Sequence, residues 1–207
     1  MGKGLFVVFE GIDGSGKGTI ISGVKKALVE AGVGEPRLLL TAEPTNGFYG
    51  KKVRELLKTN VNPDVNAHQF LDLYVADRRE HIRDALAPAI EGGKIILCDR
   101  YKYSTFVYQS LQGISLEKIR SLHEGMPVPD LVFVLDVPVE TALERIATDS
   151  KRKRLESFEK KEFLRMVREG FASLKKVFPK ENIIFVDASK PVHGVKESIL
   201  KTIFERL

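Results

Sequence analysis

Short apolar runs alternate with longer amphipathic stretches along the whole chain. Five runs have the length and apolar content of buried strands, at residues 5–9, 37–41, 94–98, 131–135 and 183–187. Helices are predicted over 20–29, 49–58, 65–91, 101–111, 116–123, 139–147, 155–178 and 192–207. This alternation predicts a parallel sheet covered by helices on both faces. Ligands of such sheets bind at the carboxyl ends of the strands.

The junction of the first strand and first helix has the spacing of a phosphate-binding loop. Gly11 is followed after four residues by Gly16-Lys17. Glycines let the backbone amides converge on an anion, the helix start adds its positive dipole end, and Lys17 adds a charge. The loop comprises Gly11, Ile12, Asp13, Gly14, Ser15, Gly16, Lys17, Gly18 and Thr19. The alternative is a glycine-rich turn that binds nothing.

Composition narrows the class of protein. A chain of 207 residues with 43% apolar content predicts a single domain, residues 1–207, with a lid at about 148–158. The single cysteine, Cys98, excludes an internal disulfide and fits a reducing cytosol. No apolar run approaches the roughly 20 residues that span a bilayer. A soluble, cytoplasmic protein is expected, and the net charge of +5 is too spread out to require nucleic acid as a partner.

Charged residues follow the third strand. Asp99 ends this apolar run, where a carboxylate in a phosphate-loop enzyme holds magnesium directly or through water. Arg100 follows at once and could grip a second phosphoryl group. The alternative is a structural ion pair between the two residues.

Two further groups of residues suggest nucleotide contacts. Tyr74 and Arg78 are four apart on a helix and share a face, so they could stack on a base and bind a phosphate. Alone, such a pair is more often a surface cation–π contact. The basic run 151–154 could close over a nucleotide, or be a solvated charge cluster.

Together, the motifs resemble the thymidylate kinase family nearly from end to end. They are Phe9-Glu10-Gly11-Ile12-Asp13-Gly14-Ser15-Gly16-Lys17, Glu43-Pro44-Thr45, Ala76-Asp77-Arg78, Asp99-Arg100-Tyr101-Lys102-Tyr103-Ser104 with Tyr108-Gln109, Pro129-Asp130-Leu131 with Leu135-Asp136-Val137, and Asp187-Ala188-Ser189. The resemblance implies a three-layer α/β sandwich of the P-loop class, with a five-stranded parallel sheet, flanking helices and a short lid. It implies transfer of the γ-phosphoryl group of ATP to dTMP with magnesium, in a homodimer.

The resemblance also implies roles for individual residues. The catalytic residues would be Lys17, Asp99, Arg100 and Arg152, and the metal ligands Thr19 and Asp99. ATP would bind to the loop from Gly11 to Thr19 and to Arg145, Ala188 and Ser189. The acceptor would bind to Asp13, Glu43, Arg54, Tyr74, Arg78, Arg100, Thr105, Tyr108 and Gln109.

Some positions depart from the family pattern. Gly18 stands where Ser or Thr usually contacts magnesium, so this role could pass to Thr19. Ala42 stands where many bacterial members have arginine. The lid has Ser157 where arginine is usual, and Gly14 where some members carry a catalytic arginine. Members with glycine there rely on lid arginines, so Arg152 is the candidate lid catalyst, with neighbouring cations in support.

Three alternatives stay open on the sequence. Another nucleoside-monophosphate kinase, for adenylate or uridylate, fits the Gly-Lys-Gly-Thr order at residues 16–19. A GTPase-type switch lacks an Asn-Lys-x-Asp signature in this chain. A nucleic-acid-binding ATPase would show salt-dependent binding to DNA. The residues expected around the base favour thymine.

Overall fold

The computed structural model describes residues 4–58, 66–148 and 161–207. Its centre is a five-stranded parallel sheet in the order β2-β3-β1-β4-β5. The strands are β1 (Leu5–Glu10), β2 (Leu38–Ala42), β3 (Ile95–Asp99), β4 (Leu131–Asp136) and β5 (Ile183–Asp187). All five agree with the predicted strands to within one residue at each end, and the predicted sheet is confirmed.

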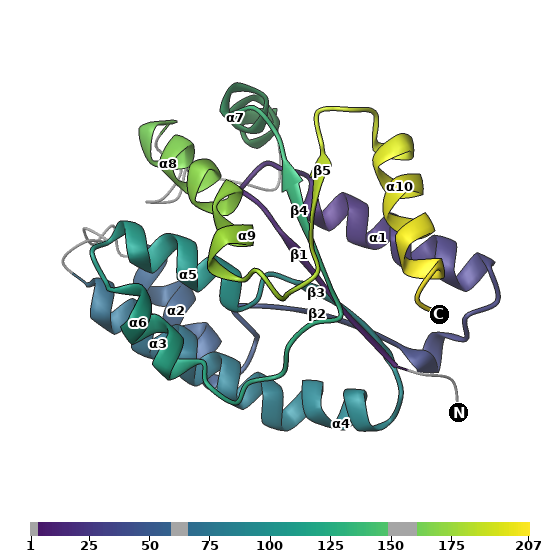
Figure 1. Cartoon of the computed structure of the whole chain (residues 1–207), viewed down its shortest axis with the longest axis horizontal. Coiled ribbons are helices and arrows are strands. Elements are labelled where there is room, and N and C mark those ends of the chain that lie inside the picture. Colours follow the sequence, from purple (N-terminus) through teal and green to yellow (C-terminus); the bar gives the residue numbers. More distant parts are fainter. Residues whose placement is uncertain (1–3, 59–65, 149–160) are drawn as a thin grey trace.

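Helices cover both faces of this sheet (Figure 1). They are α1 (Lys17–Glu30), α2 (Phe48–Lys58), α3 (Ala67–His81), α4 (Ala87–Glu91), α5 (Lys102–Leu111), α6 (Leu116–Leu122), α7 (Val139–Thr148), α8 (Lys161–Ala172), α9 (Leu174–Val177) and α10 (Val192–Phe204). Helices α1 and α10 pack against each other on one side of the sheet, and α5 and α8 pack against each other on the other. This three-layer arrangement confirms the predicted fold class.

The core lies between these layers. Every residue of β1 is buried, as expected for a central strand covered on both faces. The apolar residues of β3 and β4 join it, with Phe9 and Phe133 in contact at a ring-centroid distance of 5.7 Å. No helix in the described part of the chain is long and apolar enough to cross a membrane.

The predicted helix over 65–91 is a composite element. Its first part is α3, its last part is α4, and a π-helical turn (η2, Ile82–Leu86) joins them. Pro88 explains the interruption, because proline has no amide hydrogen for the carbonyl four residues earlier and its ring presses on that carbonyl. A wider turn just before Pro88 relieves this conflict. The predicted helix over 155–178 is similarly divided into α8 and α9 at Ser173, and its start lies outside the described residues.

The order of the strands determines where ligands can bind. From β1 the chain passes to β2 and β3 on one side, and later to β4 and β5 on the other. The direction of winding thus reverses at β1, and such a reversal leaves a crevice at the carboxyl ends of the strands. The loop after β1 and the residues after β3 both lie at this edge.

Candidate active site

The loop after β1 has the backbone conformation that its glycines allow. Gly11, Gly14 and Gly16 have φ angles of 138°, 79° and 92°. These values are costly for residues with a side chain. At Gly14 space is also lacking, since a Cβ atom would lie 2.3 Å from the carbonyl oxygen of Ala142 on α7. An arginine at this position would therefore require the loop or α7 to move.

Gly14→Ala is expected to lower the free energy of unfolding by roughly 1–3 kcal/mol, because it combines a left-handed backbone with a backbone clash. Gly18→Ala is the matched control, since no atom lies within 4 Å of its added Cβ and its backbone is helical. That change should be neutral or stabilising by up to roughly 1 kcal/mol. Urea unfolding measures both. Equal stabilities for the two variants would contradict this description of the loop.

Lys17 lies at the start of α1 and is buried. Its Nζ donates hydrogen bonds to the carbonyl oxygens of Gly11, at 3.0 Å, and Ile12, at 3.2 Å. Burial, and next the charge of Arg100, lower the pKa of its ammonium group. The lysine is thus held at the loop by weak neutral acceptors, which an anion with full charge could replace.

A cavity of about 730 Å³ opens over this loop. The residues that line it are Asp13, Gly14, Gly16, Lys17, Gly18, Thr19, Asp99, Arg100, Arg145, Ile146 and Thr148. Arg145, from α7, donates to the carbonyl oxygens of Ser15, at 3.5 Å, and Ala188, at 3.1 Å. It thereby connects the loop to the residues after β5. We call this space the phosphate cavity.

Glu10, the last residue of β1, fixes the start of α5. Its buried carboxylate accepts hydrogen bonds from the amides of Tyr101, at 2.9 Å, and Ser104, at 3.2 Å, and from the Ser104 hydroxyl, at 2.6 Å. Burial raises the pKa of this carboxyl group. Between β3 and α5, Arg100 adopts a φ of 67°, which is uncommon for a residue with a side chain. Strain of this kind persists where surrounding contacts impose it.

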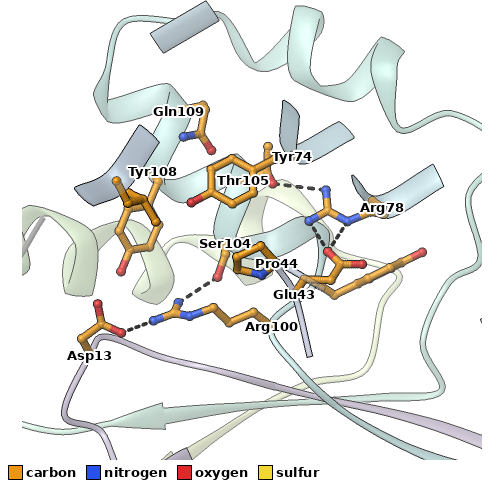
Figure 2. A pocket seen from close by; sticks show the side chains of 12 residues that line it. Asp13, Glu43, Pro44, Tyr74, Arg78, Arg100, Ser104, Thr105, Tyr108 and Gln109 are labelled. Carbon is orange, nitrogen blue, oxygen red and sulfur yellow. Dashed lines mark hydrogen bonds and ion pairs between the residues drawn. The ribbon is translucent and has the colours of Figure 1, made fainter. Parts of the chain in front are cut away.

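In this conformation the side chain of Arg100 extends to the loop after β1. Its terminal nitrogens bond to the Asp13 carboxylate at 2.5 Å and to the Ser104 hydroxyl at 3.0 Å (Figure 2). The structural ion pair between Asp99 and Arg100, which the sequence left open, is thus replaced by one between Asp13 and Arg100. Among the residues described here, no hydrogen-bond donor reaches the buried Oδ1 of Asp99. That oxygen is therefore available to a ligand.

A second cavity, of about 110 Å³, lies on the other side of this ion pair (Figure 2). Its lining residues are Asp13, Glu43, Pro44, Leu57, Tyr74, Arg78, Arg100, Tyr101, Ser104, Thr105, Tyr108 and Gln109. We call it the acceptor cavity. Asp13 and Arg100 line both cavities, so the two spaces meet at one ion pair. A donor phosphate and an acceptor phosphate bound in them would both adjoin Arg100.

Arg78 is held rigidly beneath the acceptor cavity. Its Nε and one terminal nitrogen lie 2.8 and 2.6 Å from the same carboxylate oxygen of Glu43. The other oxygen of Glu43 lies 2.9 Å from Nδ1 of His81. Arg78 also lies over the ring of Tyr101, at 5.1 Å, and is 1% exposed, which contradicts the alternative of a surface contact between Tyr74 and Arg78. The carboxylate of Glu43 therefore forms a buried ion pair with the guanidinium group of Arg78.

The two cavities include most of the residues expected to bind nucleotides. Arg54 is absent from both linings, and its terminal nitrogens donate instead to the carbonyl oxygens of Pro44 and Thr45. Ala188 and Ser189 are also outside both, although Ala188 bonds to Arg145. The same holds for three residues of the loop after β1, Gly11, Ile12 and Ser15. Arg152 and nearly all of the predicted lid lie outside the described residues.

Sequence reasoning did not assign four residues of the acceptor cavity, namely Pro44, Leu57, Tyr101 and Ser104. Tyr101 and Ser104 belong to a motif quoted above, so their proximity to Arg100 was available as a signal. Leu57 gave no signal, because an apolar residue on an amphipathic helix usually indicates only packing.

Comparison with known proteins identifies the family of this chain. Residues 9–199 match the family described as thymidylate kinase. The chain is 39% identical to the thymidylate kinase of Brachyspira hyodysenteriae, over 98% of this chain and 95% of the relative. It is 39% identical to that of Desulfotalea psychrophila, covering 99% and 96%, and 36% identical to the probable thymidylate kinase of Pyrococcus abyssi, covering 99% and 98%. The chain belongs to the thymidylate kinase family.

Proposed function

We propose that this chain transfers the γ-phosphoryl group of ATP to dTMP, giving dTDP and ADP. The observation that carries the proposal is the meeting of the phosphate cavity and the acceptor cavity at Asp13 and Arg100. Phosphoryl transfer needs donor and acceptor phosphates held in line, with positive charge at their junction. Lys17 and the amides of the loop would hold the donor, and Arg100 would adjoin both phosphates.

The hydrogen-bonding groups of the acceptor cavity suit a keto pyrimidine. The Nε2 of Gln109 donates to Oε1 of Gln112 at 3.0 Å, whereas its own buried Oε1 has no hydrogen-bond partner among the described residues. Thymine offers an N–H donor next to a carbonyl acceptor, while cytosine offers a bare ring nitrogen next to an amino group. Such an acceptor pairs with the ring N–H of thymine, but not with the bare ring nitrogen of a cytosine bound in the same orientation.

Phosphoryl transfer between these substrates depends on how the two phosphates are positioned, and not on proton transfer by a side chain. The acceptor phosphate is already a nucleophile at neutral pH, so we assign no general base. The ion pair between Arg100 and Asp13 keeps the arginine directed at the junction before substrates bind. Arg54 and Tyr74 are proposed to contact the acceptor's phosphate and base, and Arg145, Ala188 and Ser189 to bind the nucleoside end of ATP. Arg152 remains the proposed lid catalyst.

We propose that magnesium accompanies ATP in the phosphate cavity. The unpaired Oδ1 of Asp99 lines it with Lys17, and the exposed Thr19 adds a hydroxyl group at the start of α1. Oxygen donors of this kind suit magnesium, which usually keeps several waters and binds through few protein ligands. In the described part of the chain no three His, Cys, Asp or Glu side chains form a metal cluster. When bound, the ion neutralises charge on the phosphates.

Asp99→Asn is expected to raise the magnesium concentration for half-maximal activity by roughly tenfold, because it removes a full charge next to the metal. Thr19→Val should change this concentration only mildly if water and phosphates complete the coordination. Titration of magnesium at saturating ATP measures both effects. If Thr19→Val raised the required magnesium concentration strongly while Asp99→Asn left it unchanged, the metal ligand would be the Thr19 hydroxyl group and not Asp99.

A panel of acceptors tests the proposed activity. ADP release is measured by a coupled assay with dTMP, dUMP, dCMP, CMP, UMP and AMP, each with and without magnesium. We expect the highest kcat/KM with dTMP, and a value for dCMP lower by roughly a hundredfold or more, because the buried acceptor of Gln109 would face the bare ring nitrogen of a cytosine bound in the same orientation. Best turnover with AMP or CMP would overturn the proposal.

We further propose that the chain forms a homodimer in the cytoplasm. Phe48 and Tyr49 support an interface at α2, because both are exposed and their rings touch each other at a centroid distance of 5.1 Å. On the neighbouring α3, by contrast, Phe70, Leu71 and Val75 are buried. Sedimentation analysis over a range of concentrations measures the oligomeric state.

A further inference from the structure

The guanidinium group of Arg78 has almost all of its donors occupied. Besides its two contacts with Glu43, one terminal nitrogen lies 3.1 Å from the hydroxyl oxygen of Thr105 and 2.5 Å from Nε2 of His123. Arginine has five N–H groups, and these contacts account for four of them. Three residues from distant parts of the chain thus fix one side chain that is 1% exposed.

The hydrogen bonds of His123 determine its protonation. Its Nδ1 lies 2.7 Å from the carbonyl oxygen of Ile119, which can only accept, so Nδ1 carries the hydrogen. In the neutral ring the other nitrogen is then an acceptor, and it faces Arg78. Burial, and next the charge of Arg78, lower the pKa of His123 to about 3, with Lys102 and Arg79 adding repulsion. His123 is therefore neutral throughout the physiological range of pH.

The contact between Arg78 and Thr105 determines the direction of a hydrogen bond at the wall of the acceptor cavity (Figure 2). Arginine can only donate, so the Thr105 oxygen accepts from Arg78. The hydroxyl hydrogen of Thr105 is consequently left for a partner other than Arg78. Thr105 lines the acceptor cavity, where a base carbonyl would be such a partner. Gln109 offers an acceptor in the same cavity, so the wall presents a donor beside an acceptor.

We propose that His123 is a positioning residue for the acceptor base: as a neutral acceptor it holds Arg78 so that Thr105 donates into the cavity. The inference rests on the proposed function, because it concerns the same acceptor. His123 lines neither cavity and follows α6, so it acts only through Arg78. Without this acceptor, a buried N–H group of Arg78 lacks a partner and the guanidinium can turn toward Thr105 or into the cavity.

A purely structural role for His123 is the competing explanation. The ring packs against Phe106, at a centroid distance of 5.5 Å, and its Nδ1 satisfies a carbonyl at the end of α6. Two substitutions separate the roles. In His123→Asn the side-chain amide can replace Nδ1 toward Ile119 but cannot reach Arg78. In His123→Gln it can replace Nε2 toward Arg78, while the bond to Ile119 is lost.

The experiment measures kcat, the KM values for dTMP and ATP, and the kcat/KM ratio of dTMP to dCMP for wild type and both variants, with melting temperatures alongside. We expect His123→Asn to raise the KM for dTMP by roughly tenfold and to lower the dTMP to dCMP ratio, with the KM for ATP within about twofold. For His123→Gln, the KM for dTMP and the dTMP to dCMP ratio should both stay within about threefold of wild type, whatever the melting temperature of the variant.

The reverse order would overturn the proposal. If His123→Asn keeps the wild-type KM and ratio while His123→Gln loses them, the bond to Ile119 matters and the role is structural. Equal kinetics in both variants, with lowered melting temperatures, would also overturn it. An inactive wild-type protein would count against the proposed function instead. Calorimetric binding of dTMP to each variant gives a second readout that does not depend on turnover.

Discussion

Replacing Lys17 with methionine is expected to lower kcat by roughly 10²–10³-fold, because charge developing on the transferred phosphoryl group loses a buried positive partner. Methionine keeps most of the side-chain volume, so the loop should keep its shape. The carbonyl oxygens of Gly11 and Ile12 lose a hydrogen-bond donor, which costs some stability. Steady-state kinetics at saturating ATP and dTMP measure the effect on kcat.

The control for this variant is Lys26→Met, on the same helix. Lys26 is exposed and lies 3.7 Å from Glu30 in a solvent-exposed ion pair, so its removal should leave kcat within about twofold. The account would be contradicted if the loss in Lys17→Met appeared only as a raised KM for ATP with kcat unchanged. Such a result would assign Lys17 to ground-state binding alone.

Arg78→Met is expected to lower the free energy of unfolding by roughly 3–5 kcal/mol, because Glu43 is left as a buried charge without its arginine partner. The side chains of the pair are 1% and 3% exposed, so water cannot compensate. His81 retains its contact with Glu43 and limits the loss. The dTMP affinity should fall in the same variant, since Thr105 loses its fixed donor. Urea unfolding and calorimetry measure the two effects.

The double variant Arg78→Met with Glu43→Gln provides the control. It removes both charges, so it should recover much of the stability that the single variant loses. Affinity for dTMP should stay low, because the arginine is still missing. If the double variant were no more stable than Arg78→Met, the stability would depend on packing around Arg78 and not on the ion pair.

Local patterns in the sequence were sufficient for the sheet and for the phosphate loop. The central strands β1, β3 and β4 are apolar runs buried on both faces, and the partly exposed edge strands β2 and β5 are apolar enough to be recognised as well. The spacing from Gly11 to Lys17 specifies the backbone of the loop. The π-helical turn before Pro88 could not be predicted, because a proline within a helical pattern indicates a kink or a break but not which of the two forms.

Contacts between distant segments could not be predicted in the same way. The ion pair between Asp13 and Arg100 joins residues 87 positions apart, and the contact of Arg78 with His123 spans 45. Neither residue type nor spacing indicates which acceptor a buried arginine selects. Arg54 illustrates the same limit, since its place on a helix was predicted but its bonds to backbone carbonyls were not. The hydrogen-bond partners of these side chains depend on which distant segments the fold brings together.

The transfer of labelled phosphate tests the central claim most directly. The protein is incubated with ATP labelled at the γ position, magnesium and dTMP, and the labelled products are separated. Because the phosphate and acceptor cavities meet at Arg100 and Asp13, we predict that the label appears in dTDP in equal amount to the ADP formed. Label released as inorganic phosphate, with dTMP unchanged, would contradict the account.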